Sequence, residues 1–151
     1  MYAAWGCTMA EMTVKPVKLW VLTGADRKGM LAEALEPLAA AGANLRIVMA
    51  YRMEQGGRAA VEVFPIEGKA VDAARKAGFK ESETACLLAE GDDKPGQGAQ
   101  MARAIANAGV SMAFLMEETV GKRYSAAIGF SNEADATTAR KAIEGLGGKK
   151  K

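Results

Sequence analysis

Hydrophobic and polar positions in the first half of the chain follow strand spacing and helix spacing in turn. Strands are indicated by β-branched and apolar runs with partial two-residue alternation, and helices by apolar residues three or four positions apart. The pattern predicts elements in the order β-α-β-β-α-β, over residues 17–23, 30–41, 44–53, 58–64, 68–77 and 79–83. This is the order of the ferredoxin-like α+β unit, in which helices cover one face of an antiparallel sheet.

The same order returns in the second half of the chain. Strands are expected over residues 85–89, 110–120 and 124–130, and helices from 96 or 97 to 108 and from 132 or 135 to about 145. Asn132 or Asp135 is expected to cap the last helix, because a short polar side chain accepts from the first N–H groups. The sequence stops at Lys151, so the fourth strand of the second copy is expected to be short or absent.

Two short polar turns stand at the same place in the two copies. Asp26-Arg27-Lys28-Gly29 precedes the first helix, and Asp93-Lys94-Pro95-Gly96 precedes its counterpart in the second copy. A gapless alignment over residues 21–79 also matches four pairs of glycines. Such matches are informative because a turn position requires glycine only where the backbone geometry is special. These pairs are Gly24/Gly91, Gly29/Gly96, Gly42/Gly109 and Gly78/Gly145. The chain is therefore predicted to contain one unit made twice.

The repeat predicts the division of the chain into domains. The first unit is expected over residues 14–82 and the second over residues 83–148. Residues 1–13 are expected to be a leader with little structure, and 149–151 a solvated basic tail. No Pro/Ser-rich linker separates the copies, which favours closely docked halves.

Composition excludes several classes of function. The sequence has no histidine, so His-dependent triads and His-ligated metal sites are excluded, and we expect no catalytic residues, metal or cofactor. Cys7 and Cys86 lie in unlike contexts, which favours a reduced, cytoplasmic protein. The net charge is +2 without a basic aromatic stripe, so no nucleic acid is expected as a partner. No apolar run approaches the ~20 residues of a membrane span, so no membrane is expected either.

The two turns are candidate binding sites because each opens a helix. A helix N-terminus presents unpaired N–H groups and partial positive charge, which can hold a carboxylate. Asp26 and Asp93 either cap their helices or bind a ligand ammonium group, and both roles remain open. Gly29 and Gly96 either serve the turn or let a ligand carboxylate approach the backbone. The Glu117-Glu118 pair is interpreted as a solvated strand end.

These features together resemble the ACT domain, a small regulatory module that binds amino acids in many metabolic enzymes. The resemblance lies in a strand, the Asp93–Gly96 turn, an apolar helix, Ala108-Gly109-Val110-Ser111 and a glycine-bearing hairpin. The first copy shows it through Asp26–Gly29 and Ala41-Gly42-Ala43-Asn44. Positions that depart from the pattern are Lys28, Gln97 and Ser111, where the family commonly has proline, an aliphatic residue and asparagine. The resemblance covers residues 17–146.

The resemblance implies that the two antiparallel sheets lie side by side, with ligands at the seam between units. Asp26 and the N–H groups of Gly29, Met30 and Leu31 would then face Ser111 of the second unit. Asp93 and the N–H groups of Gly96, Gln97 and Gly98 would face Asn44 of the first. For Asn44 and Ser111, a hydrogen bond within their own loop is an equal alternative.

The sequence therefore predicts a non-catalytic, allosteric regulator that binds a small amino acid. As an alternative, the paired sheets form a homodimer or dock onto a partner enzyme and bind no ligand. The third hypothesis is that the protein is an enzyme. It is disfavoured because the sequence supplies no nucleophile–base pair, metal cluster or phosphate-binding loop.

Overall fold

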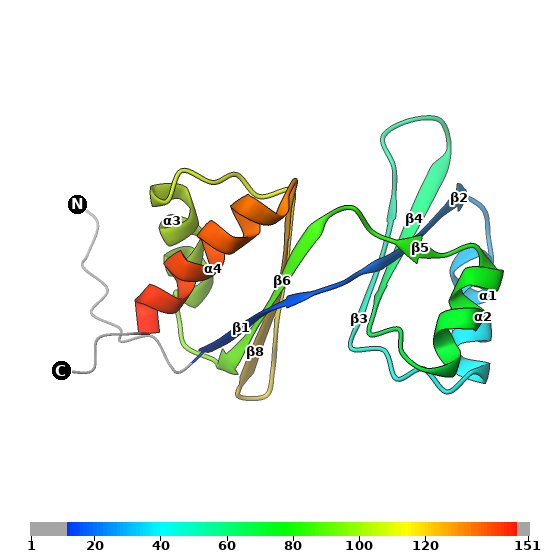
Figure 1. Cartoon of the computed structure of the whole chain (residues 1–151), viewed down its shortest axis with the longest axis horizontal. Helices are drawn as coiled ribbons and strands as arrows, with labels where there is room; N and C mark the ends of the chain where they lie inside the picture. The colour runs from blue at the N-terminus through cyan, green and yellow to red at the C-terminus, as the bar shows by residue number, and fades with distance from the viewer. Residues whose placement is uncertain (1–11, 148–151) are drawn as a thin grey trace. The chain divides into compact units, whose positions relative to one another are not determined.

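A computed structural model of the chain describes residues 12–147, so the expected basic tail and most of the expected leader lie outside the described residues. Within this range the strands are β1 (Met12–Val17), β2 (Trp20–Ala25), β3 (Ile47–Arg52), β4 (Arg58–Phe64), β5 (Lys80–Glu81), β6 (Ala85–Asp92), β7 (Phe114–Val120) and β8 (Arg123–Phe130). The helices are α1 (Met30–Ala40), α2 (Lys69–Ala77), α3 (Gln97–Asn107) and α4 (Glu133–Gly147). They form two α+β units, each with a four-stranded antiparallel sheet and two helices, as in the ferredoxin-like fold (Figure 1).

The first unit comprises Val17–Ser82. Its sheet has the strand order β3-β4-β2-β5, and the two helices α1 and α2 contact each other on one face. The core between helices and sheet is closed by fully buried side chains such as Leu38 and Val63. The Arg75 guanidinium lies 5.8 Å from the centre of the Trp20 ring, a cation–π contact at the edge of this core.

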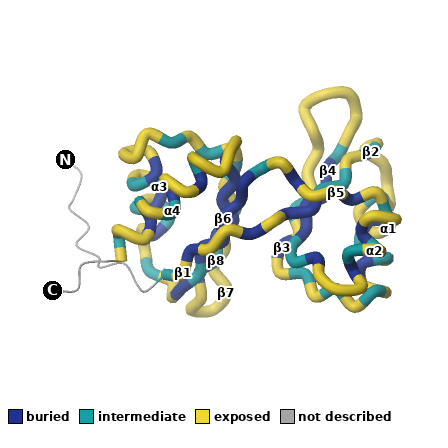
Figure 2. The backbone as a smooth tube through the Cα atoms, viewed as in Figure 1, coloured by how far each residue is buried: buried dark blue, intermediate teal, exposed yellow. Residues whose placement is uncertain are grey.

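The second unit combines residues 83–147 with the strand β1 from before the first unit. Its sheet has the order β1-β6-β8-β7, and Figure 1 shows β1, in blue, alongside β6. The Thr13 hydroxyl donates to the Glu90 carbonyl at 3.3 Å, and Val14 is 6% exposed. The dark blue segments of β6 and β8 in Figure 2 carry the remainder of this core, with α3 and α4 on it.

The position of β1 corrects two expectations. Residues 12 and 13 are strand rather than unstructured leader, and residues 14–16 join the second unit rather than the first. The fourth strand of the second copy is present, and it comes from the opposite end of the sequence. The physical reason is that β6 would otherwise be an unpaired edge, and β1 supplies the missing ladder partner. Pro16 fits because β1 is itself the outer strand.

The pairing register shows where the repeat departs from a gapless alignment. In the first unit Trp20 pairs with Val63, and in the second unit the counterpart of Trp20, Leu87, pairs with Ile128. Ile128 is therefore the structural counterpart of Val63, whereas the gapless alignment would match Val63 with Phe130. The hairpin that joins β7 to β8 is shorter than the one that joins β3 to β4, which accounts for the change of register. The match of Gly78 with Gly145 is therefore wrong: Gly78 caps α2 at φ +97°, whereas Gly145 lies inside α4.

Candidate functional site

The turn between β2 and α1 is fixed by its backbone rather than by a capping side chain. The Asp26 N–H donates to the Gly57 carbonyl at 2.7 Å, which ties the turn to the β3–β4 hairpin. Gly29 is the N-cap residue at φ +88°, a conformation that side chains disfavour, and no side chain caps the helix. The expectation that Asp26 caps α1 is therefore wrong, because glycine occupies the cap position and the aspartate stands earlier in the turn.

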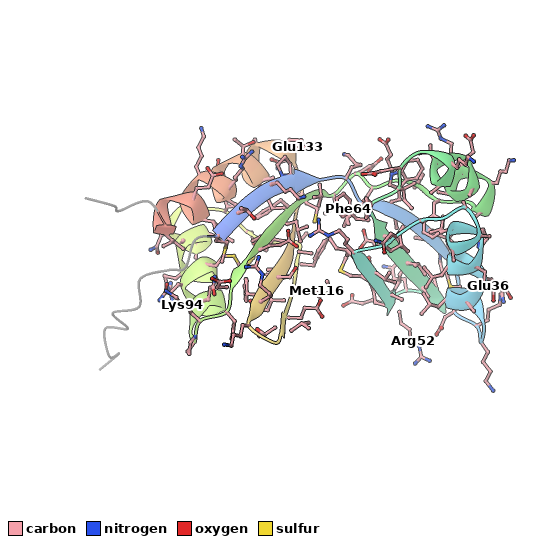
Figure 3. The ribbon with its side chains drawn as sticks, turned by 90° about the horizontal axis from the view of Figure 1, so that it is seen from below. Glu36, Arg52, Phe64, Lys94, Met116 and Glu133 are labelled. Carbon is pink, nitrogen blue, oxygen red and sulfur yellow. The ribbon has the colours of Figure 1, made fainter. Side chains whose placement is uncertain are left out.

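Two ion pairs stand at the start of α1. The Asp26 carboxylate accepts from the Arg52 Nε at 2.8 Å, and Arg52 extends from the end of β3 with 84% of its side chain exposed (Figure 3). Arg27 forms two hydrogen bonds with Glu33, one of them at 2.8 Å, and the bonded guanidinium lowers the pKa of the Glu33 carboxyl. Exposed ion pairs of this kind contribute little stability, so their side chains can exchange the ion pair for contacts with a ligand at little cost.

A pocket of 230 Å³ lies beside these charges, between the start of α1 and strands β3 and β4. Its apolar lining includes Met30, Ala50, Ala59 and Val61, and its charged lining is Asp26, Arg27 and Arg52. Of the residues expected at the first site, the pocket brings together Asp26, Met30 and Leu31, while Gly29 shapes the turn. Charges of both signs over an apolar floor match the chemistry of an amino acid.

Tyr51 lines the same pocket from β3. Its hydroxyl donates to the Glu62 carboxylate at 3.2 Å, and burial raises the pKa of Tyr51 above its usual range. Burial also raises the pKa of the Glu62 carboxyl, which hydrogen bonds from Tyr51 and Ser82 lower in part. The contact lies on the sheet face opposite the side chains of Ala50 and Val61, because neighbouring residues of a strand point to opposite faces.

The second turn, between β6 and α3, has the same backbone plan with different chemistry. The Asp93 N–H donates to the Lys122 carbonyl at 2.9 Å, and Gly96 is the N-cap at φ +81° with no side-chain cap. Asp93 therefore does not cap α3, for the same reason as Asp26. The Asp93 carboxylate accepts from the Thr119 hydroxyl at 3.0 Å, at the position that Arg52 has in the first unit. The second turn thus has an uncharged partner where the first has a cation.

A side chain of the protein itself lies against the start of α3. The Tyr124 hydroxyl donates to the Glu117 carboxylate at 2.7 Å, and a Cβ atom added at Gly98 would overlap that carboxylate. The interpretation of Glu117 as merely a solvated strand end is therefore incomplete, because its carboxylate has a phenol donor and a helix terminus beside it. Burial raises the pKa of Tyr124, which keeps the phenol protonated as a donor.

Gln97 is the first residue of α3 and is 2% exposed. Its Oε1 accepts from the Lys94 N–H at 3.2 Å, but its Nε2 has no hydrogen-bond partner. A buried donor without a partner costs about 1–3 kcal/mol of stability. This residue stands where the first unit has Met30, so the polar side chain is a feature of the second site alone.

Replacing Gln97 with methionine is expected to raise the free energy of unfolding by about 1 kcal/mol, since the unpaired amide outweighs the lost bond to Lys94. Urea unfolding followed by circular dichroism measures the change. Gln100→Met, in the same helix at a half-buried position, is the control and should shift stability by less than about 0.5 kcal/mol. A clear loss of stability for Gln97→Met would show that its hydrogen bond matters more than its orphaned amide.

Asn44 and Ser111 lie in exposed loops that follow the C-termini of α1 and α3. Within each unit they stand at the opposite end of an 11-residue helix from the aspartate turn, about 16 Å away along its axis. The length of the helix therefore keeps each residue away from the turn of its own unit. Their expected contact with the turn of the other unit stays a prediction.

Several residues of the first pocket were missed by sequence reasoning. Arg52, Ala50 and Ala59 come from two strands that reach the turn only through the sheet pairing of β2, β3 and β4. The alternation of apolar residues in β4 gave a partial signal, since it puts Ala59, Val61 and Val63 on one face. The apolar alternation in β3 gave none, because it follows Ile47, Met49 and Tyr51 on the face opposite Ala50. Nothing local marked Arg52 as the partner of Asp26.

Solved structures similar to this chain share its fold, and some of them are regulatory parts of other proteins. The ligand-free regulatory subunit of aspartate kinase from Thermus thermophilus has a TM-score of 0.61 at 18% identity, over 93% of this chain and 99% of that one. A protein from Bacteroides thetaiotaomicron has a TM-score of 0.70 at 16% identity, over 89% and 98% of the two chains. The aspartate kinase of Clostridium acetobutylicum, described as an allosteric enzyme, has a TM-score of 0.54 at 10% identity, over 88% of this chain and 33% of the kinase.

The chain thus has the tandem ferredoxin-like fold that the resemblance of its sequence to the ACT domain implied. No protein-family model and no curated protein sequence matches it. Over the range 12–147, none of the helices has the length and apolar character needed to cross a membrane. In the same range, no three Cys, Asp or Glu side chains are grouped so that they could hold a metal ion.

Proposed function

We propose that the protein is a non-catalytic regulator that binds a small amino acid at the first turn. The observation that carries this proposal is the 230 Å³ pocket with Asp26, Arg27 and Arg52 around an apolar floor. The Asp26 carboxylate would hold the ligand ammonium group. Arg52 and the positive N-terminal end of α1 would hold its carboxylate. The Met30 N–H would not take part, because it donates to the Arg27 carbonyl at 3.3 Å.

The floor of the pocket favours an apolar side chain on the ligand. Met30, Ala50, Ala59 and Val61 offer methyl and methylene surface and no hydrogen-bonding side-chain group. A ligand with an uncharged aliphatic side chain would bury it there without leaving polar groups unpaired. L-valine and L-leucine are accordingly the first candidates among the amino acids.

Regulation would follow from the coupling of ligand binding to a change in conformation or association. The family resemblance supports a ligand at the seam between units, with Ser111 near the first turn, and a homodimer or a partner enzyme as the responding assembly. The regulatory names of the similar structures support the same reading. The buried thiol of Cys86, which donates to the Leu87 carbonyl at 3.6 Å, supports a reduced, cytoplasmic location.

The test is thermal unfolding in the presence of each of the twenty amino acids at about 10 mM, followed by calorimetry on those that respond. A ligand with a dissociation constant near 0.1 mM stabilises the folded state by about 2.7 kcal/mol at that concentration. Asp26→Asn is expected to weaken binding by about 10- to 100-fold, since a hydrogen bond to a charged group contributes about 1.5–3 kcal/mol. The absence of a response to all twenty would overturn the proposal.

The matched control is Glu36→Gln. It removes the same charge from the exposed surface of α1, outside the residues that line the pocket (Figure 3). Its affinity should stay within about twofold of the unmodified protein, because exposed charges interact weakly through solvent. An equal loss for Glu36→Gln and Asp26→Asn would mean that net charge, and not the pocket, governs binding.

A second candidate function rests on the outer strands β3 and β7. Each is the last strand of its sheet among the described strands, and each carries exposed apolar side chains, including Tyr51 at 48% and Val120 at 68%. Open strand edges with apolar side chains favour pairing with another chain. Light scattering that shows a constant complex with and without amino acids would support this interaction role.

A further inference from the structure

The two units can be compared position by position around the candidate pocket. The pairing register makes β7 the counterpart of β3, so that Ile47 matches Phe114, and β8 the counterpart of β4, so that Phe64 matches Gly129. Among the residues that change between the first and the second site are Met30/Gln97, Leu31/Gly98, Ala50/Glu117, Arg52/Thr119, Ala59/Tyr124 and Val61/Ala126. The differences therefore concern the floor of the pocket as well as its charge.

The second unit fills the space that the first leaves open. Ala50 and Ala59 line the first pocket, and their counterparts Glu117 and Tyr124 are long side chains joined by a hydrogen bond of 2.7 Å. Tyr124 is 4% exposed, so its ring is packed into the second unit. Two alanines in one unit thus correspond to a bonded glutamate and tyrosine in the other.

The Glu117 carboxylate lies where an external carboxylate would compete for α3. It is so close to Gly98, the second residue of the helix, that a side chain there would overlap it. Leu31, the counterpart of Gly98, carries a full side chain that lines the first pocket. The glycine, the glutamate and the tyrosine are therefore mutually adapted, and they place a negative group at the positive end of α3.

A carboxylate attached to the protein has an advantage over a free ligand. Tethered groups act at effective concentrations of about millimolar or more, so an amino acid must displace Glu117 before it can reach the second site. It would also meet Thr119 in place of the guanidinium of Arg52. Both differences weaken the second site relative to the first.

We propose that only the first unit takes the ligand, and that Glu117 and Tyr124 are a built-in occupant of the second site. This inference rests on the proposed function, because it assigns that function to one of the two turns. It gives a stoichiometry of one amino acid per chain and makes Glu117 and Tyr124 the residues that decide which site is open. It also makes Asp26, and not Asp93, the aspartate on which binding depends.

Calorimetric titration with L-valine, and with every other amino acid that responds in the thermal panel, tests the inference on the full chain. We expect one site per chain, an affinity loss of about 10- to 100-fold for Asp26→Asn, and less than a twofold change for Asp93→Asn. Two equal sites in the unmodified protein, or a larger effect of Asp93→Asn, would overturn the inference and leave the proposed function standing. Absence of binding by any amino acid would overturn both.

Opening the second site is the complementary test. Glu117→Ala, alone and with Tyr124→Ala, reproduces the alanines of the first unit and should add a second, weaker binding event. The neighbouring Glu118→Ala removes the same charge and should leave one site. A stoichiometry that stays at one in folded Glu117→Ala protein would overturn the role of Glu117.

A third test closes the first site instead, and it does not depend on whether the second unit stays folded when the buried Tyr124 is removed. The triple variant Leu31→Gly, Ala50→Glu, Ala59→Tyr gives the first unit the residues of the second, and it should lose at least about tenfold in affinity. Ala50→Glu alone, which leaves the buried positions unchanged, should show part of this loss. Affinity within twofold of the unmodified protein in both variants would overturn the inference.

Discussion

A variant that lacks residues 1–16 is expected to keep a folded first unit and to lose the folded second unit. The deletion removes β1, so β6 loses its outer partner and the buried side chain of Val14 disappears from the second core. Burial of one valine contributes about 1.5–3 kcal/mol, and each lost strand hydrogen bond adds about 0.5–1.5 kcal/mol. The total is close to the whole stability of a small domain.

The deletion also simplifies its own measurement. It removes Trp5 and leaves Trp20, which is buried in the first unit, as the only tryptophan. Tryptophan fluorescence then reports on the first unit, while amide dispersion in a two-dimensional NMR spectrum reports on both. A variant that begins at Met12 keeps β1 whole and is the control. Dispersed amide signals from residues 83–147 in the longer deletion would contradict the prediction.

Phe130→Ala is expected to lower the stability of the second unit by about 3–5 kcal/mol. The side chain is 0% exposed at the end of β8, within the core that β6, β8, α3 and α4 enclose. Its removal leaves a cavity that packed neighbours fill only in part, so the lost transfer energy and the cavity add together.

Urea unfolding with NMR signals assigned to each unit measures this effect separately for the two halves. Val120→Ala is the control, because Val120 is 68% exposed in the same unit and its truncation should cost less than about 0.5 kcal/mol. The first unit should keep its midpoint, since its core is a separate cluster around Leu38 and Val63. A loss of under about 1 kcal/mol for Phe130→Ala would mean that the site collapses around the missing ring.

Much of the fold could be predicted because its turns depend on glycine. Gly29 and Gly96 have φ values of +88° and +81°, and Gly42 and Gly109 have +82° and +77°, so each matched pair marks a backbone shape that other residues disfavour. Asn132 was also recognised as a cap, and its Oδ1 accepts from the Asp135 N–H at 2.8 Å. Local chemistry of this kind is readable from short stretches of sequence.

The errors came from pairings between distant residues. The gapless repeat placed Gly145 at a helix end, because two hairpins of different length look alike until the strand register is known. The strand β1 was overlooked because it precedes both copies, although Met12 and Val14 alternate with Thr13 and Lys15 as in a half-buried strand. A missing fourth strand in the second copy was the signal that another segment had to supply it.

The candidate site was predicted in outline and not in detail. Asp26, Met30 and Leu31 line the first pocket, as the turn suggested, but the cap roles of Asp26 and Asp93 are wrong. The contrast between an open first pocket and a filled start of α3 depends on Ala59 and Tyr124, which sit on return strands far from either turn in sequence. Only the sheet register makes these two residues counterparts.

The pairing of β1 with β6 also sets an order of events during synthesis. Thr13 and Glu90, which are hydrogen-bonded, lie 77 residues apart. At a synthesis rate of about 5–20 residues per second, roughly 4–15 s pass between the synthesis of β1 and that of its partner strand β6. The intervening residues 17–82 contain all four strands of their own sheet, so the first unit can fold during this delay. Strand β1 is thus synthesised before the first unit and pairs only after that unit is complete, so it must stay soluble as an unpaired strand in the meantime.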